Sequence, residues 1–497
     1  MTRIESRAVP EPVSGRPAPT LAVVLAGMLT LSMSMSGTNV ALPDIGADLR
    51  ASGAALQWVV TGYFLTASSF MLIAGSLGDL FGRRRVYRAG LGLFVAGLAL
   101  SALAPGIWLL DAARAAAGLG AAGVMASGGA LLAATFEGAA RAKAFAAFGT
   151  VGGVGLAAGP TLSGLLVSGL GWRGTFWVFA IAGILIWAGA RLVPEARPAS
   201  EAKPRVDVTG AATFIAALAL LMAAVTQGPQ NGWGHPLVLA ALVAGPALLG
   251  VFVVLQRRAA HPVLDLTLVL DRRYLAWTLA GLTGAIGFAG SLAYLPAYFQ
   301  GVDGAGAGEA GLMMLLLTGP VLVAPMVSGR LVSRGHPARV VIGVALGLVA
   351  AGNAWLTVLR PGLGVVGLAG PLLAIGVGTG LANGIVDGQA MNQVAPARSG
   401  MAAGFLNTVR GGGQAMMIAA FGSALLNLVQ ARVGSTKLAG RVVYGDLRGG
   451  DAGFLAAQLT GAWQTVLWVI AAVTVVMLVL VTALLRGRHP VMGATGR

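Results

Sequence analysis

Residues 75–90 read GSLGDLFGRRRVYRAG and join two long apolar runs, 55–78 and 86–106. A helix that crosses a bilayer needs roughly 20 mostly apolar residues, and each run has that length. Glycines, arginines and one aspartate make a short polar break between the runs, which predicts a tight turn at a membrane surface. The stretch therefore indicates a helical hairpin within a bilayer rather than part of a water-soluble core.

The composition extends this pattern over the whole chain. Of the 497 residues 57% are hydrophobic and 10% are charged, and the mean hydropathy is +0.82, which is too apolar for a water-soluble core. In lipid, a spanning segment can satisfy its own backbone as a helix. The sequence therefore predicts an all-α polytopic membrane protein with fourteen spans, near 22–46, 55–78, 86–106, 108–134, 142–167, 173–192, 208–228, 236–256, 275–299, 310–329, 339–359, 363–388, 402–427 and 462–485.

Two long polar breaks, residues 193–207 and 257–273, divide the predicted spans into blocks. The breaks bracket a pair of helices between two blocks of six. The expected units are an N-terminal tail at 1–20, a six-helix bundle at 21–193, two linker helices with flanking loops at 194–273, a second six-helix bundle at 274–487 with an outer loop at 428–461, and a tail at 488–497.

The two blocks resemble each other in one loop. After the second helix of the second block, residues 328–339 read SGRLVSRGHPAR, which repeats the glycine, leucine and arginine features of residues 75–90. Ser333 takes the place of Asp79. A chance match between two basic loops is the alternative, but repeated halves around a central site are typical of transporters.

The net charge of +16 comes from basic residues that sort by loop. Nucleic-acid binding would gather them on a soluble face. They concentrate instead in alternate breaks, at 83–88, 257–258, 330–339 and 486–488, as the positive-inside rule describes. The pattern predicts a multi-pass protein of the bacterial cytoplasmic membrane with both termini in the cytoplasm. We expect a monomer that contacts the lipid bilayer and binds no nucleic acid.

Several catalytic patterns are missing from the sequence. No lysine follows a glycine, so there is no GxxxxGK[ST] loop to hold a nucleotide. The four histidines lie in loops or flanks and form neither HExxH nor an i,i+4 pair, and the chain has no cysteine. We therefore expect neither an enzyme nor a bound cofactor, nucleotide or metal.

Five polar side chains within the predicted spans are candidate site residues, because polar groups are costly there. Arg114 lies about two turns into the fourth span, with Asp111 three residues earlier on the same face. One alternative is that the two form a structural ion pair, and another is that Asp111 already lies in the outer interface. The third is that Arg114 faces a cavity and modulates a nearby proton site. Asp387 is either a protonatable cavity residue or the polar end of its helix. Asn39 and Tyr63 either line the cavity or serve in helix packing.

The fifth span reads GTVGGVGLAAGPTLSG over residues 149–164. Gly155 and Gly159 have the spacing of closely packed transmembrane helices. Pro160 removes a backbone donor and bends the helix axis. Together these residues predict a thin, bendable helix at an interface, which can close a pathway or let it open.

These motifs together resemble the major facilitator superfamily, and within it the fourteen-helix drug:proton antiporters. The matching residues are Gly75, Leu77, Asp79, Gly82, Arg83 and Arg84 after the second span, Arg114, Gly118 and Gly120 in the fourth, Gly155, Gly159, Pro160 and Gly164 in the fifth, NVALP at 39–43 and GWRGTFW at 171–177. The sequence departs from the family pattern at Leu80, Ala117 and Ser34. The last stands where the family usually carries an acidic residue.

The resemblance implies a secondary active transporter that exports lipophilic drugs or antibiotics by alternating access, in exchange for protons. Because Ser34 replaces a carboxylate, the proton would need another carrier, such as Asp111 or Asp387, or the transport would be coupled differently. An uptake symporter or facilitator of the same fold is the alternative. A membrane sensor that does not transport is a further reading, since a fold does not fix a function.

Residues 75–84 are then expected to act as a gate as well as an anchor. Attraction to anionic lipid would explain the arginines alone. Asp79 adds an acceptor for a neighbouring helix N-terminus and for Arg83, in a latch that breaks when the two halves separate. Gly75 and Gly82 are expected to allow close backbone approach and a tight turn.

Overall fold

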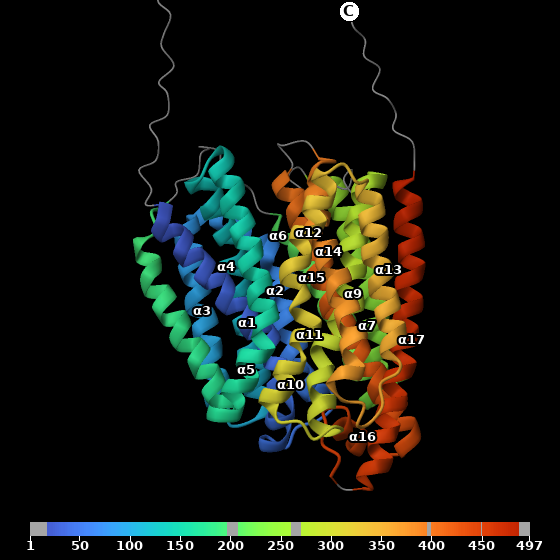
Figure 1. Cartoon of the computed structure of the whole chain (residues 1–497). Helices are drawn as coiled ribbons and strands as arrows, with labels where there is room; N and C mark the ends of the chain where they lie inside the picture. Colours follow the sequence, from blue (N-terminus) through green and yellow to red (C-terminus); the bar gives the residue numbers. More distant parts are fainter. Residues whose placement is uncertain (1–16, 196–206, 260–269, 395–398, 449, 487–497) are drawn as a thin grey trace, which may run out of the picture.

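A computed structural model describes residues 17–195, 207–259, 270–394, 399–448 and 450–486. Within these ranges all regular structure is helical, and Figure 1 shows the helices side by side in two main groups. Helix α1 (Pro17–Asp48) begins and helix α17 (Ala452–Leu485) ends at the same end of the molecule, the top of Figure 1. We call this the terminal end and the opposite one the distal end.

The first group follows the chain from α1 to the end of α5. Its members after α1 are α2 (Ala54–Phe81), α3 (Arg83–Leu103), α4 (Ile107–Thr135), α5 (Gly138–Gly189) and the 3₁₀ helix η1 (Ala190–Leu192). Helix α5 is broken at Gly171, whose φ of 68° and ψ of 173° are not helical, so it runs as two successive helices. Helices α6 (Val208–Asn231) and α7 (Pro236–Arg258) follow and pack on each other, and α6 also contacts α2.

The second group follows the two linker helices along the chain and ends with α17. Its other members are α9 (Arg272–Gly301), α10 (Ala307–Met313), α11 (Leu315–Thr318), α12 (Pro320–Ser333), α13 (Ala338–Leu356), α14 (Gly364–Met391), α15 (Ser399–Val433) and α16 (Thr436–Val442). Helices α10, α11 and α12 follow one another as a single span. Met314 and Gly319, the residues that separate them, both keep φ and ψ in the right-handed helical region. Helix α16 is a short helix at the distal end.

Twelve helices among the described residues are long and apolar enough to cross a membrane. This number counts α5 once across its break and does not include α2, although α2 has 28 residues. The expected all-α polytopic class is confirmed. The expectation of fourteen spans stays a prediction.

Helices α3 and α4 pack with their backbones nearly in contact. A methyl group at Gly90 would lie 2.9 Å from the carbonyl oxygen of Gly120, and one at Gly97 would lie 2.6 Å from the backbone nitrogen of Ala117. Helices in lipid associate through such small-residue contacts, because lipid tails are as apolar as the side chains they would replace. The glycines are therefore structural at this contact.

The break in α5 lies in a corner where three parts of the chain meet at the distal end. Arg173 forms an ion pair with Asp48, at the end of α1, and donates from Nη2 to the carbonyl oxygen of Ala104 at 3.2 Å. Trp172 donates from Nε1 to the same carboxylate at 3.2 Å. The GWRGTFW segment therefore connects the end of α1, the end of α3 and the two parts of α5.

The contact between α3 and α4 predicts a clear difference between two glycine substitutions. Gly97→Val should lower the melting temperature of the detergent-purified protein, because overpacking typically costs about 1–3 kcal/mol. Gly347→Val in α13 is the matched control, since a methyl group there would meet no atom within 4 Å. Equal melting temperatures for the two variants would contradict the close backbone packing.

Candidate transport site

The two groups of helices are joined by hydrogen bonds in the distal half of the molecule. Most tie a side chain of one group to a backbone atom of the other. The bonds are Asn39 Nδ2 to Leu292 O (3.3 Å), Gln300 Nε2 to Val40 O (3.0 Å), Gln57 Nε2 to Ala419 O (2.7 Å), Thr161 Oγ1 to Gly311 O (2.8 Å), Thr318 Oγ1 to Ala157 O (2.8 Å), Gly308 N to Ser168 Oγ (2.9 Å) and Gly53 N to Gly440 O (3.4 Å). We call this set of contacts the distal seam.

The glycine and proline motif of α5 contacts α1 of the same group and α10 of the other group. A methyl group at Gly155 or Gly159 would lie 2.7 or 2.8 Å from a carbonyl oxygen of α1. Pro160 and Gly164 face the other group instead. A methyl group at Gly311 in α10 would lie 2.5 Å from the carbonyl oxygen of Pro160, and Gly164 lies against the backbone at the start of α10. The motif therefore places α5 within the distal seam.

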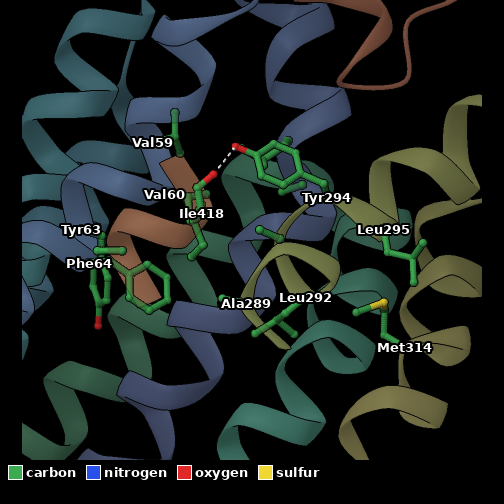
Figure 2. Packing of buried hydrophobic residues seen from close by; sticks show 14 of the residues in the cluster. Val59, Val60, Tyr63, Phe64, Ala289, Leu292, Tyr294, Leu295, Met314 and Ile418 are labelled. Carbon is green, nitrogen blue, oxygen red and sulfur yellow. Dashed lines mark hydrogen bonds between the residues drawn. The ribbon is translucent and has the colours of Figure 1, made fainter. Parts of the chain in front are cut away.

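Buried apolar side chains fill the seam beside these hydrogen bonds. Figure 2 shows part of this cluster, in which the hydroxyl of Tyr294 in α9 donates to the carbonyl oxygen of Ile418 in α15 at 3.2 Å. Val59 and Val60 of α2 belong to the same cluster. The Tyr294 ring also stacks on Phe421, with 5.6 Å between ring centres. The seam is therefore mainly apolar, with a few directional bonds.

The connection between α15 and α17 covers the distal end of the seam. Tyr444, which follows α16, is 5% exposed, and its ring centre lies 5.8 Å from that of Tyr294. Burial, together with the nearby Tyr294 and Asp111, raises the pKa of Tyr444 well above its ordinary value. The phenol therefore stays neutral.

Asp446 in the same connection forms ion pairs with two arginines. Its Oδ2 lies 2.8 Å from Arg441 Nε, and its Oδ1 lies 3.0 Å from Arg448 Nε. Partial burial alone would raise the pKa of Asp446, but hydrogen bonds from Arg441 and Arg448 lower it to about 2. The charged carboxylate therefore holds the connection in its folded shape.

Arg114 lies buried in the first group, with 1% of its surface exposed. Its Nε donates to the carbonyl oxygen of Val59 at 3.2 Å. The guanidinium lies 4.5 Å from the ring centre of Tyr63 and 5.6 Å from that of Phe176. Attraction between a cation and an aromatic ring strengthens when water is excluded. Arg114 thus joins α4 to α2 and to the second part of α5.

Asp111 does not pair with Arg114, although it lies one helical turn away. Within the described residues no ion pair joins the two, and both carboxylate oxygens of Asp111 are buried without a hydrogen-bond partner. The ion pair considered from the sequence is therefore absent, because Arg114 extends toward α2 and the second part of α5. A buried, unpaired carboxylate is costly as an anion, so Asp111 is most easily held here as a neutral acid.

Asn39 and Tyr63 both lie in packing contacts. The amide of Asn39 bridges α1 and α9 in the distal seam, and only 1% of the residue is exposed. Tyr63 is 2% exposed and lies beneath Arg114. Both residues therefore fit the packing alternative rather than a water-accessible surface.

An ion pair in the second group joins α14 and α15. Arg410 Nη1 lies 3.1 Å from Asp387 Oδ1, and Arg410 also donates to the side-chain oxygen of Asn407. The Asp387 side chain is 54% exposed although it falls in a predicted span. A methyl group at the adjacent Gly411 would lie 3.1 Å from Ser68 Cβ in α2. The pair therefore lies near the junction of the two groups, toward the terminal end of α14.

The corner between α2 and α3 is a tight turn at Gly82, where φ is 98°. A side chain there would be strained and would also meet Glu195. A methyl group at Gly75 would meet no atom within 4 Å, so the close backbone approach expected at that residue does not occur. The side chain of Asp79 lies outside the described residues.

Arg83 and Arg84 connect this corner to two other parts of the first group. Arg83 Nη1 donates to the carbonyl oxygen of Ala130 near the end of α4 at 3.0 Å. Arg84 Nη1 donates to the carbonyl oxygen of Val193 at 3.0 Å, and its Nε lies 3.3 Å from Glu195 Oε2, an ion pair without hydrogen-bond geometry. Arg84 therefore holds the chain where it leaves the first group for the linker helices.

The equivalent corner of the second group differs. Helix α12 ends at Ser333, and Arg330, Arg334 and Arg339 around it are exposed. Among the described residues no ion pair involves these three arginines. The anchor formed by Arg84 and Glu195 thus has no counterpart there.

Several residues of these contacts were not predicted as site residues, among them Arg410, Gln57 and Glu195. Arg410 is an arginine inside an apolar span, and Gln57 is a lone amide at the start of another, so both carry a signal that sequence reasoning could have used. Glu195 is one of several charges in a polar break, and nothing in the sequence distinguishes it.

The fold and the seam between two groups of helices are those of a membrane transporter. The family model of the Major Facilitator Superfamily matches residues 24–418, and the chain belongs to this superfamily. Its members are transporters rather than enzymes.

Curated relatives match most of the chain. The multidrug resistance protein Stp of Mycobacterium tuberculosis is 34% identical over 82% of this chain and 75% of its own length. The puromycin resistance protein pur8 of Streptomyces alboniger is 34% identical over 84% of this chain and 83% of its own length. The cephamycin export protein CmcT of Amycolatopsis lactamdurans is 33% identical over 82% and 84%.

Solved structures share the fold at low sequence identity. A bacterial homolog of the human lysosomal transporter Spinster, in an inward-facing, occupied conformation, gives a TM-score of 0.65 at 17% identity and covers 95% of this chain and 97% of its own. The POT family transporter PepTSo gives 0.64 at 15% identity, over 94% and 97%.

The ion pairs of Asp446 predict how stability depends on pH at the distal end. Because its pKa is lowered from 3.8 to about 2, the contribution of Asp446 to stability is present above 3.8 and disappears as the pH falls through about 2. Asp446→Asn should therefore melt below the wild type near neutral pH, and the two melting temperatures should converge toward pH 2. A difference that stays constant over this range would contradict the ionised contacts.

Proposed function

We propose that this chain exports lipophilic drugs or antibiotics across the bacterial cytoplasmic membrane by alternating access. The superfamily supports transport, and relatives named for multidrug resistance, puromycin resistance and cephamycin export support drugs as the substrate class. No soluble domain interrupts the helices of the described residues, so the pathway must run between the helices themselves.

The observation that carries this proposal is the placement of the distal seam. Every hydrogen bond between two described residues that joins the two groups lies in the distal half. These bonds connect the distal parts of α1, α2 and α5 with those of α9, α10, α11, α15 and α16. A transporter that opens to one side at a time needs its closed side joined and its open side free of such bonds.

The arginines supply the proposed orientation. Arg85, Arg257, Arg258, Arg330, Arg334 and Arg339 are exposed at the helix ends that lie at the terminal end. Such clusters are retained on the cytoplasmic side of a membrane. In this proposal the terminal end faces the cytoplasm, and the joined distal seam would close the pathway to the outside.

The gating group of the proposal is the corner at residues 75–84, with Gly75, Asp79, Gly82, Arg83 and Arg84. Arg84 and Glu195 link the corner to the chain that enters the linker helices, so a movement of the first group carries the linker segment with it. Asp79 is assigned the latch toward the other group. Arg114 is a positioning residue, because it holds α4, α2 and α5 together from within.

The proposed coupling residue is Asp387, with Arg410 as its counter-ion. Its exposed carboxylate near the cytoplasmic end of α14 can release a proton to the cytoplasm in this state. Protonation would remove the partner of Arg410, whose charge would then need another anion or water. Asp111, buried in the distal half, is the second candidate, since its carboxylate gains water when the distal seam opens.

Direction and coupling can be tested together in inverted membrane vesicles with an acidic interior. The wild type should accumulate ethidium and puromycin in the vesicles, and dissipation of the pH gradient should release them. Asp387→Asn should abolish this accumulation and still exchange labelled for unlabelled puromycin, because the pathway remains while the gradient no longer drives it. Glu309→Gln, at an exposed carboxylate in the first turn of α10, is the matched control and should behave as the wild type.

Two results separate the parts of this proposal. Accumulation in right-side-out vesicles alone would contradict export and favour uptake. If Asp387→Asn still accumulates the substrates and Asp111→Asn does not, Asp387 is not the coupling residue. Asp111 would then be the residue that carries the proton.

A further inference from the structure

An apolar groove lies between α2 and α3 in the terminal half of the first group. It encloses about 440 Å³, and α4 contributes Leu119 and Gly123 to its wall. Helices α2 and α3 both pack on α4. Phe81, at the end of α2 and 62% exposed, stands at one end of the groove. No step of the proposed export cycle takes place in this groove.

The length of the groove matches half of a bilayer. Along α2 its lining residues extend from Phe70 to Phe81, which at the helical rise corresponds to roughly 16 Å. Half of the hydrocarbon core of a bilayer is about 15 Å thick. Because Phe81 lies at the terminal end and Phe70 near the middle of the molecule, the groove extends through the depth of one leaflet.

The groove carries one charge, and it lies where a lipid headgroup would be. Arg85 is the only ionisable residue that lines it, and it lies in the first turn of α3. Arg85 is exposed, and no other described residue forms an ion pair with it. The neighbouring arginines are already engaged, Arg84 with Glu195 and Arg88 over the ring of Trp187 at 5.0 Å.

We propose that this groove binds one acyl chain of an anionic phospholipid from the leaflet at the terminal end, with its phosphate paired to Arg85. An apolar wall of leaflet depth suits a hydrocarbon chain, and a guanidinium with no ion-pair partner at the rim suits a phosphate. A lipid held there contacts both α2 and α3 on either side of Gly82, so it stabilises the corner between the two helices.

Native mass spectrometry of the detergent-purified protein tests this site with phosphatidylglycerol and phosphatidylcholine that carry the same acyl chains. The wild type should retain one phosphatidylglycerol in preference to phosphatidylcholine. Arg85→Gln should reduce this preference about fivefold, the effect of one basic residue near an anionic membrane surface. Arg257→Gln, at an exposed arginine at the end of α7 that does not line the groove, is the matched control and should keep the preference.

A second variant fills the groove itself. Ala89 is an exposed lining residue of α3, and Ala89→Trp should reduce the retention of both lipids, because the indole occupies the space of the acyl chain. Unchanged retention and preference in both variants would overturn the proposal. Displacement of the bound lipid by puromycin, together with lost export in Ala89→Trp, would overturn it in favour of a substrate entry site. Neither result depends on the direction of transport.

Discussion

The close approach of α5 to two different helices is the contact on which the arrangement depends. Glycines at 155 and 159 allow it to approach α1, and Gly164, together with Gly311 of α10, allows it to approach α10 of the other group. Without these small residues the backbones could not approach, and the hydrogen bonds from Thr161 and to Ser168 would be out of reach. The same helix therefore belongs to the rigid interior of one group and to the movable surface between the two.

The distal seam is made of contacts that can be broken at modest cost. Its hydrogen bonds join neutral groups, and such bonds contribute about 0.5–1.5 kcal/mol each when water can replace them. In the proposed cycle, opening to the outside would admit that water. The strongly bound charges lie elsewhere, Arg114 within the first group and Arg410 within the second. Each group would therefore keep its interior intact if the seam opens and closes as proposed.

Hydropathy and loop charge predicted the membrane class and the positions of most spans, because these properties depend on the local sequence alone. The glycine spacing of α5 predicted an interface, and in the structure these glycines lie against α1 and α10. The partners of charged side chains were not predictable. Spacing in α4 suggested a pair between Asp111 and Arg114, but Arg114 bonds to Val59, 55 residues away in sequence, because tertiary packing sets its direction. The contact of Arg84 with Glu195 likewise depends on how α5 returns to the terminal end.

Alternating access about the distal seam requires that the seam opens while the terminal end closes. The chain has no cysteine, so pairs of cysteines can be introduced and spin-labelled without background. One pair, at the exposed residues Leu165 and Leu312, would report on the distal seam, and another, at Lys143 and Arg334, on the terminal end. We expect puromycin and acidification to lengthen the first distance and shorten the second. Distances that stay fixed, or that change in the same direction, would contradict alternating access about this seam.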